Sequence, residues 1–262
     1  MNKKLKNFTY SQNSLNTYKV CPTKFKYKYI DNISLNIGEV ENRDYYESLK
    51  LGRDFHLVCE RYFRKIPTGL SSGNEKFERW IKKIKKVVPI KDENIYLPEY
   101  EVRLRLGENN IQAKYDLVVI GKNTISIWDW KTEAKKIEHR NLENRMQTIV
   151  YMFLAKEVIP KLLDVEVDYK NIKMNYYQPE FYVDPITINY SEEKHNINKN
   201  KILSLMDIVQ RTVFEEEDYK DICENKIDLI KNKDNCKFCE FNKLCNGQEV
   251  DYKNLEDEVY GT

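Results

Sequence analysis

Three apolar runs between residues 101 and 131 constrain the fold most, because two of them contain an aspartate. The runs are EVRLRL (101–106), IQAKYDLVVI (111–120) and TISIWDWK (124–131). They are rich in β-branched residues, and the turn-forming segments GENN and GKN separate them. This pattern predicts three consecutive strands that form a meander.

Helical periodicity flanks these strands on both sides. Apolar residues at helical spacing predict helices near 45–64, 74–88, 141–158 and 191–213, and two short helices within 11–30. Further strands are expected at 171–177 and 181–190. We therefore expect an α/β fold, with a central mixed sheet flanked by helices. One domain of residues 1–262 is expected, with a core at about 45–180, a loop-like C-terminal section and a disordered acidic tail at about 250–262.

Composition excludes some classes of protein. The formal net charge is only +2, so a nucleic-acid contact would have to come from local clusters of charge. The lysine-rich segment 74–88 fits a solvated helix face better than a DNA contact. No apolar stretch approaches the length of a membrane span, and no leader is recognisable. These features predict a cytoplasmic protein without a membrane partner.

The aspartates and a lysine predict a shared site. Asp129 and Lys131 point to the same side of their strand, where Asp116 on the neighbouring strand can join them. Burying carboxylates is costly unless they are paired or bind a cation. A divalent metal with hard oxygen ligands would suit this group, and a buried salt bridge is the equally weighted alternative.

Two helices add candidate residues to this group. Gly52, His56 and Glu60 follow one another at steps of four on the helix before the strands. Gln147 and Tyr151 lie one turn apart on the helix after them. Taken alone, the histidine is more often structural than a metal ligand, and the second pair fits an ordinary amphipathic helix.

The ordered set G-x-x-x-H-x-x-x-E, Asp, D-x-K-T and Q-x-x-x-Y resembles the RecB-like branch of the PD-(D/E)XK nucleases. The resemblance implies a restriction-endonuclease-like core and a DNA nuclease that hydrolyses phosphodiester bonds with Mg²⁺ or Mn²⁺. It covers most of the chain. An exonuclease or end-processing role in recombination, repair, CRISPR adaptation or phage DNA metabolism is implied, on single strands or duplex ends, with a helicase or integrase as a candidate partner.

The same resemblance assigns roles residue by residue. Asp116, Asp129 and the main-chain carbonyl of Trp130 would hold the metal, with His56 as a further ligand. Lys131 would orient the attacking water and offset negative charge. The others would assist: Glu60 at the metal, Gln147 and Tyr151 in orienting the site and the DNA backbone, and, as a weaker candidate, Glu101 at the start of the first strand.

The cysteines predict a second metal site. Cys236, Cys239 and Cys245 lie within one short segment, and clustered thiols in a chain without a secretion signal indicate metal binding. Cys21, Cys59 and Cys223 are candidates for a fourth ligand. The residues alone leave zinc and an iron–sulfur cluster open.

The segment CPTKFKYKY resembles the one that supplies the first ligand in iron–sulfur RecB-like nucleases, such as AddB-type domains and CRISPR-adaptation nucleases. This resemblance implies a [4Fe–4S] cluster on Cys21, Cys236, Cys239 and Cys245, with zinc as the less favoured metal. The cluster would join the ends at 11–30 and 223–247. The alternative function is a catalytically silent DNA-binding or scaffold subunit of a larger complex.

Overall fold

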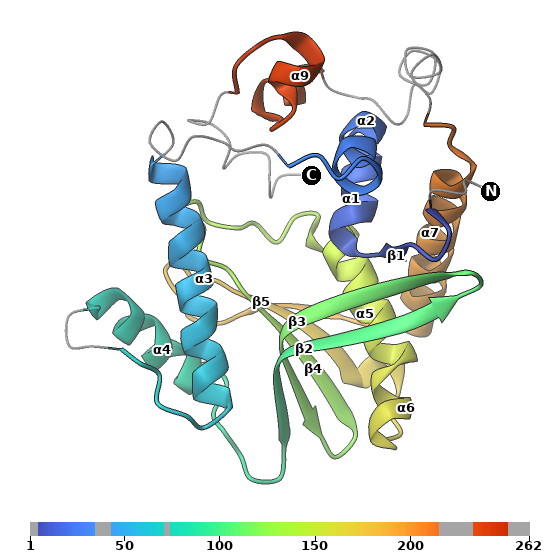
Figure 1. Cartoon of the computed structure of the whole chain (residues 1–262). Coiled ribbons are helices and arrows are strands. Elements are labelled where there is room, and N and C mark those ends of the chain that lie inside the picture. Colours follow the sequence, from blue (N-terminus) through green and yellow to red (C-terminus); the bar gives the residue numbers. More distant parts are fainter. Residues whose placement is uncertain (1–4, 35–42, 71–73, 215–232, 251–262) are drawn as a thin grey trace.

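A mixed sheet forms the centre of the protein, whose computed structural model describes residues 5–34, 43–70, 74–214 and 233–250 (Figure 1). The strand order is β1-β3-β4-β5-β6, and β2 also pairs with β3. The β1–β3 and β4–β5 pairs are parallel and the others antiparallel. The strands are β1 (Thr9–Tyr10), β2 (Ile95–Leu106), β3 (Asn109–Gly121), β4 (Thr124–Trp130), β5 (Ile172–Tyr177) and β6 (Ile186–Asn189).

Helices cover both faces of this sheet. α3 and α4 share one apolar cluster with Leu117 and Trp128, whereas α1, α5 and α7 share another with Val118 and Ile127 (Figure 1). The helices are α1 (Gln12–Val20), α2 (Pro22–Phe25), α3 (Arg43–Phe63), α4 (Glu75–Val87), α5 (Met146–Glu157), α6 (Ile159–Leu163), α7 (Glu192–Arg211) and α9 (Asn242–Asn246). The expected α/β arrangement of a mixed sheet between helices is confirmed.

The expected meander is confirmed as β2, β3 and β4. Leu106 pairs with Asn109 across the GENN turn, where Gly107 has the positive φ of 63° that glycine adopts at little cost. Gly121 pairs with Thr124 across the second turn. The β2–β3 hairpin is the longest pairing in the sheet, and its outer half projects beyond β4 (Figure 1).

The hairpin has an irregular step where β2 passes Asp116. In β3, Ile111, Ala113 and Tyr115 point to the α5 side, but beyond Asp116 it is Val118 that points there. Opposite this step, Glu99 has a φ of 51° and directly follows Pro98, which cannot donate a ladder hydrogen bond. The alternation of faces therefore changes phase at Glu99 and Asp116, and both carboxylates lie at the step.

The helix α5 is buried on nearly all sides because the sheet, α1 and α7 surround it. Nine of its residues are buried, from Met146 to Ala155. The N-terminal segment is fixed to α7 by Gln210, whose side-chain amide donates to the Leu5 carbonyl oxygen, the Tyr10 hydroxyl and Asn109 Oδ1. Ser11 caps α1 by accepting from the Ser14 amide.

Several sequence expectations differ from the structure. β1 and α6 are not predicted, because elements of two and five residues have no resolvable period. The strand expected at 181–190 covers only Ile186–Asn189. The C-terminal section contains a 3-10 helix at Lys233–Phe238 and α9 rather than loop alone. The tail beyond residue 250 and Cys223 lie outside the described residues.

No described helix combines the length and apolar character that a membrane crossing requires.

We expect Phe153→Ala in α5 to lower the free energy of unfolding by about 3–5 kcal/mol, because Phe153 is fully buried and its loss leaves a cavity. Chemical denaturation followed by circular dichroism measures this change. The control is Leu162→Ala in the adjacent α6, whose side chain is 59% exposed. Equal effects of the two substitutions would contradict the described packing.

Candidate active site

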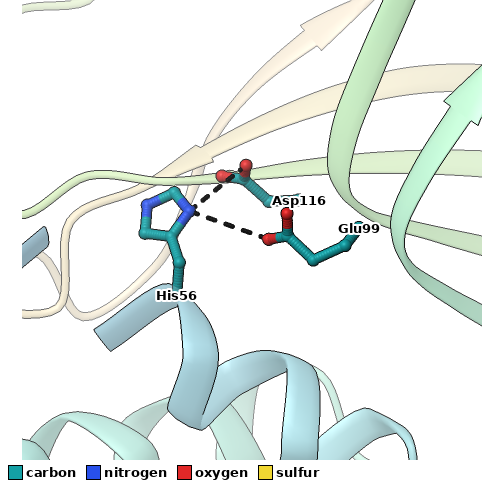
Figure 2. A group of neighbouring side chains, drawn as sticks. All are labelled: His56, Glu99 and Asp116. Atoms are coloured by element: carbon teal, nitrogen blue, oxygen red, sulfur yellow. Dashed lines mark ion pairs between the residues drawn. The ribbon is translucent and has the colours of Figure 1, made fainter. Parts of the chain in front are cut away.

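Three side chains from three different elements converge at the hairpin step (Figure 2). His56 of α3 points toward Glu99 of β2 and Asp116 of β3. His56 Nδ1 lies 3.4 Å from Asp116 Oδ1 and 4.0 Å from Glu99 Oε1. One ligand atom from each residue lies within 4.8 Å of the other two. This group of one nitrogen and two carboxylate ligands has the composition of a divalent-metal site.

Main-chain groups of Trp130 hold this group in place. The Trp130 amide donates to Asp116 Oδ2 at 2.7 Å, and His56 Nε2 lies 3.1 Å from the Trp130 carbonyl oxygen. If Nε2 carries the hydrogen, Nδ1 can face the carboxylates or a metal ion. The Trp130 carbonyl, expected as a metal ligand, therefore accepts from His56 in this structure. Its second lone pair is available to a cation.

Burial is the largest single influence on His56 and lowers its pKa, but the neighbouring carboxylates, Asp116 foremost, together outweigh it and raise the pKa to about 9. A hydrogen bond with Asp116 and the charges of Asp129 and Glu99 act in the same direction. In the metal-free protein, His56 is therefore protonated at neutral pH. The positive imidazolium offsets part of the negative charge that the site gathers.

A second group lies directly beside the first and is more deeply buried. Lys131 Nζ contacts Asp129 Oδ2 at 2.9 Å and donates to Gln147 Oε1 at 3.4 Å. Gln147 Nε2 in turn donates to Asp129 Oδ1 at 2.6 Å. Asp129 is 3% exposed and Lys131 9%. The salt bridge weighed as an alternative thus exists, and it lies next to the candidate metal group.

Burial raises the pKa of Asp129 to about 6, although the positive charge of Lys131 opposes this shift and Asp116 adds to it. Burial lowers the pKa of Lys131, but Asp129 and Glu133 outweigh it, so the net shift is upward. Lys131 is therefore a permanently charged group in this site. A buried cation beside two carboxylates suits charge stabilisation better than proton abstraction.

Gly52 allows α3 to approach the site closely. A Cβ added at Gly52 would lie 3.1 Å from Thr132 Oγ1, which is tighter than ordinary contact. Thr132 directly follows Lys131 in the chain. The four-residue step from Gly52 to His56 therefore places one helical turn against the end of β4 and the next against the carboxylates.

The other predicted residues lie around this centre. Tyr151 donates to the Lys114 carbonyl oxygen at 2.6 Å, and Gln12 Nε2 lies 3.5 Å from the Tyr151 hydroxyl. Glu60 pairs with Arg64 at 2.9 Å and does not belong to the group of His56, Glu99 and Asp116. Tyr151 thus fixes β3 at the site, and Glu60 borders it.

Glu99, not Glu101, is the acidic residue that the first strand contributes. Glu101 is exposed and lies 3.3 Å from Arg103 Nη2. Glu99 contacts Lys114 Nζ at 2.6 Å as well as facing His56. Strand alternation alone could not identify Glu99, because its positive φ breaks the pattern. The preceding Pro98, unusual within a strand, is the sequence signal that could have located the step.

The four cysteines expected to form a cluster are brought together from both ends of the described chain. Burial and the neighbouring thiols of Cys239, Cys21 and Cys236 together raise the pKa of Cys245 to about 11. Contacts between the two segments support the arrangement: Lys28 Nζ lies 3.3 Å from Glu240 Oε1, and the Tyr27 and Phe241 rings are 5.4 Å apart. Cys59 is buried in the α3–α4 cluster and takes no part.

A match to a protein-family model bears on this fold. A family model described as the PD-(D/E)XK nuclease superfamily matches residues 9–94 and 74–246. The crystal structure of SSO0001 is similar at 15% identity and a TM-score of 0.40, covering 91% of this chain and 86% of that one. The crystal structure of a "Putative exonuclease" from Eubacterium rectale is similar at 9% identity and a TM-score of 0.49, covering 93% and 95%. Among curated proteins, none matches.

The matched segments together include α3, the three-stranded meander, α5 and the last cysteine segment. The expected PD-(D/E)XK fold is therefore confirmed, and the helix and strands that carry His56, Asp116, Asp129 and Lys131 all lie within the match. The chain belongs to the PD-(D/E)XK nuclease superfamily.

Proposed function

We propose that this protein is an active deoxyribonuclease of the RecB-like branch that depends on Mg²⁺ or Mn²⁺. The observation that carries the proposal is the convergence of His56, Glu99 and Asp116 directly beside the buried pair of Asp129 and Lys131. Members of the superfamily typically use divalent metals. A hydrolytic phosphodiesterase needs both a cation site and a group that offsets developing charge, and these two clusters supply them.

The chain's own residues have separable roles in this proposal. His56, Glu99 and Asp116 hold the metal, and Asp129 completes the acidic surroundings. The bound metal would activate water and stabilise negative charge on the phosphate. Lys131, whose pKa is raised by Asp129, stays protonated and offsets charge on the attacked phosphate group. Gln147 holds Asp129 and Lys131 in register, and Tyr151 fixes β3 beneath the substrate.

An active enzyme is favoured over a catalytically silent scaffold because the candidate metal ligands lie beside the charged pair of Asp129 and Lys131. A copy that only binds DNA would have no need for Glu99 at a backbone conformation that costs about 1–3 kcal/mol. DNA ends as substrate, and a helicase or integrase as partner, rest on the resemblance to RecB-like nucleases. Assays with linear, circular, single-stranded and duplex DNA, and with RNA, separate these substrate classes.

We expect Asp116→Asn to lower the rate of DNA cleavage by about a hundredfold or more, because the metal loses a charged ligand that two strands position. Lys131→Met should reduce the rate as strongly. The measurement is cleavage of labelled single- and double-stranded DNA with Mg²⁺ or Mn²⁺. Removing Lys131 alone leaves Asp129 buried without its cation, so folding of this variant is checked first by circular dichroism.

The matched control uses two glutamates on one strand. Glu99→Gln should weaken Mn²⁺ binding by at least about tenfold, whereas Glu101→Gln should leave binding and cleavage unchanged, since Glu101 contacts only Arg103 among the interactions described. Mn²⁺ affinity is measured by isothermal titration calorimetry. If the Glu99 and Glu101 variants behave alike, Glu99 is not a ligand; if Asp116→Asn cleaves at the wild-type rate, the catalytic assignment is wrong.

Metal binding should depend on pH through His56. Its pKa of about 9 means that a metal at Nδ1 must displace a proton at neutral pH. We expect release of about one proton per Mn²⁺ bound, and an apparent affinity that rises about tenfold per pH unit between pH 7 and 8. Calorimetry in buffers of different ionisation enthalpy counts the protons. His56→Gln should abolish this dependence, and an unchanged proton count in that variant would argue against His56 as the ligand.

We also propose that Cys21, Cys236, Cys239 and Cys245 bind a [4Fe–4S] cluster. The thiols of Cys239, Cys21 and Cys236 act electrostatically on Cys245, so the four cysteines lie near one another. Four thiolates suit either metal, and the resemblance to iron–sulfur RecB-like nucleases favours the iron–sulfur cluster. Zinc is the alternative.

Anaerobically purified protein should be brown and contain about four iron and four sulfide per chain, as that cluster type requires. Cys21→Ser should reduce both the visible absorbance and the iron content, because the fourth ligand is lost. Cys59→Ser is the control, since Cys59 lies in the α3–α4 cluster. A colourless, zinc-loaded wild type would overturn the iron assignment and retain the four-thiol site.

A further inference from the structure

The segment of residues 132–141 joins two parts of the candidate active site. It begins directly after Lys131 and leads through a short 3-10 helix to α5, which carries Gln147. Both Lys131 and Gln147 contact Asp129, so the path of this segment affects how the two side chains meet the carboxylate. The segment has no helix or strand of its own. Its position must therefore come from contacts with other elements.

Gln178 supplies most of those contacts. Its side chain is fully buried, and Nε2 donates to the carbonyl oxygens of Glu133 at 2.9 Å and Lys135 at 2.8 Å. Its Oε1 accepts from the Ile137 amide at 2.9 Å. One side-chain amide thus holds three alternate positions of the segment, as a neighbouring strand would. All three hydrogen bonds of the Gln178 side-chain amide go to main-chain groups, so they fix the course of the backbone in this segment.

Gln178 is itself held firmly at the end of β5. The carbonyl oxygen of the preceding residue, Tyr177, accepts from the Lys131 amide at 2.9 Å. The backbone hydrogen bonds between β4 and β5 therefore continue up to the residue next to Gln178. Beyond Gln178, Trp80 of α4 donates to Glu180 Oε2 at 2.7 Å, and Lys83 donates to the Pro179 carbonyl oxygen. This uses part of the lysine-rich face of α4 for packing.

The Tyr182 hydroxyl adds one more anchor by donating to the Ile137 carbonyl oxygen. Ile137 is buried, whereas its neighbours Lys135 and Lys136 are exposed. If Gln178 lost its amide, the freed groups of Glu133 and Lys135 could turn to water. The main loss would then be the path of the segment, and not the folding of the whole chain.

We propose that Gln178 is a positioning residue of the nuclease: it fixes the segment 132–141 and so sets Lys131 and Gln147 against Asp129. This inference rests on the proposed function. Gln178 does not touch Asp129 or Lys131 through its side chain in the described contacts. Its effect must therefore appear in the rate of the chemical step and not in the binding of DNA.

The test compares Gln178→Met with Gln210→Met. Both substitutions replace a buried glutamine that donates to several oxygens, and both keep the length of the side chain. Gln210 holds Leu5, Tyr10 and Asn109, and none of these residues belongs to the candidate active site. For Gln178→Met we expect kcat lower by about 10- to 100-fold with KM for DNA unchanged. The Ile137 amide should also exchange its hydrogen faster. Gln210→Met should leave kcat unchanged.

Each outcome decides the inference. The inference about Gln178 is overturned if Gln178→Met has the wild-type kcat, or if Gln178→Met and Gln210→Met lose kcat equally. Loss of cleavage by Asp116→Asn in the same assay shows that the assignment of the active site still holds. A rise in KM alone would make the segment a DNA contact and reject positioning. If Gln178→Met does not fold, Tyr182→Phe removes one anchor of Ile137 and must lower kcat measurably. A wild type that cleaves no nucleic acid overturns this inference and the proposed function together.

Discussion

The concentration of negative charge at the hairpin step is the constraint that the surrounding structure meets. Glu99, Asp116 and Asp129 lie together, and each has a cationic partner: Lys114 at 2.6 Å, His56 at 3.4 Å and Lys131 at 2.9 Å. Without partners, buried carboxylates would take up protons or destabilise the fold. The pairing keeps them charged and available. A bound metal ion would displace the proton of His56 and leave Lys131 in place, since only Lys131 has the deeply buried partner.

Helix α3 and the end of β4 deliver these partners because they pack closely. Gly52 lets α3 approach Thr132, and one turn later His56 reaches both the carboxylates and the Trp130 carbonyl. The amide of Trp130 meanwhile holds Asp116. A single residue of β4 therefore orients a ligand on the helix and a ligand on the neighbouring strand. This explains why the pattern of glycine and histidine on the helix occurs together with D-x-K on the strand.

Much of the fold follows from local sequence pattern, but the site follows only in part. The strands around Asp116 and Asp129 and the helix around His56 have clear periods, and the structure brings these residues together as expected. Glu99 could not be found this way, because its left-handed backbone shifts the alternation of β2. Gln178 was equally hidden: its role depends on three main-chain groups more than forty residues earlier, and no spacing reports such contacts.

The two ends of the chain are joined by contacts of unequal strength, and this bears on what a cluster would do. The N-terminal segment is fixed to α7 by Gln210 and by the buried contact of Tyr18 with Thr212. The segment 233–250 is attached by the buried Phe241, whose ring lies 5.4 Å from that of Tyr27, and by the ion pairs of Glu240 with Lys24 and Lys28 at the surface. Surface ion pairs contribute about 0–1 kcal/mol each.

The cost of closing a loop grows only with the logarithm of its length, so a link from Cys21 to the last cysteines is not unfavourable for being long. A thiolate-bound cluster would therefore act locally, holding the final segment onto the core of the fold beside Cys21. The nuclease site is attached to that core through β3, β4 and α3, none of which contains a cluster cysteine. Loss of the cluster should thus affect the C-terminal segment before it affects the geometry of the charged site.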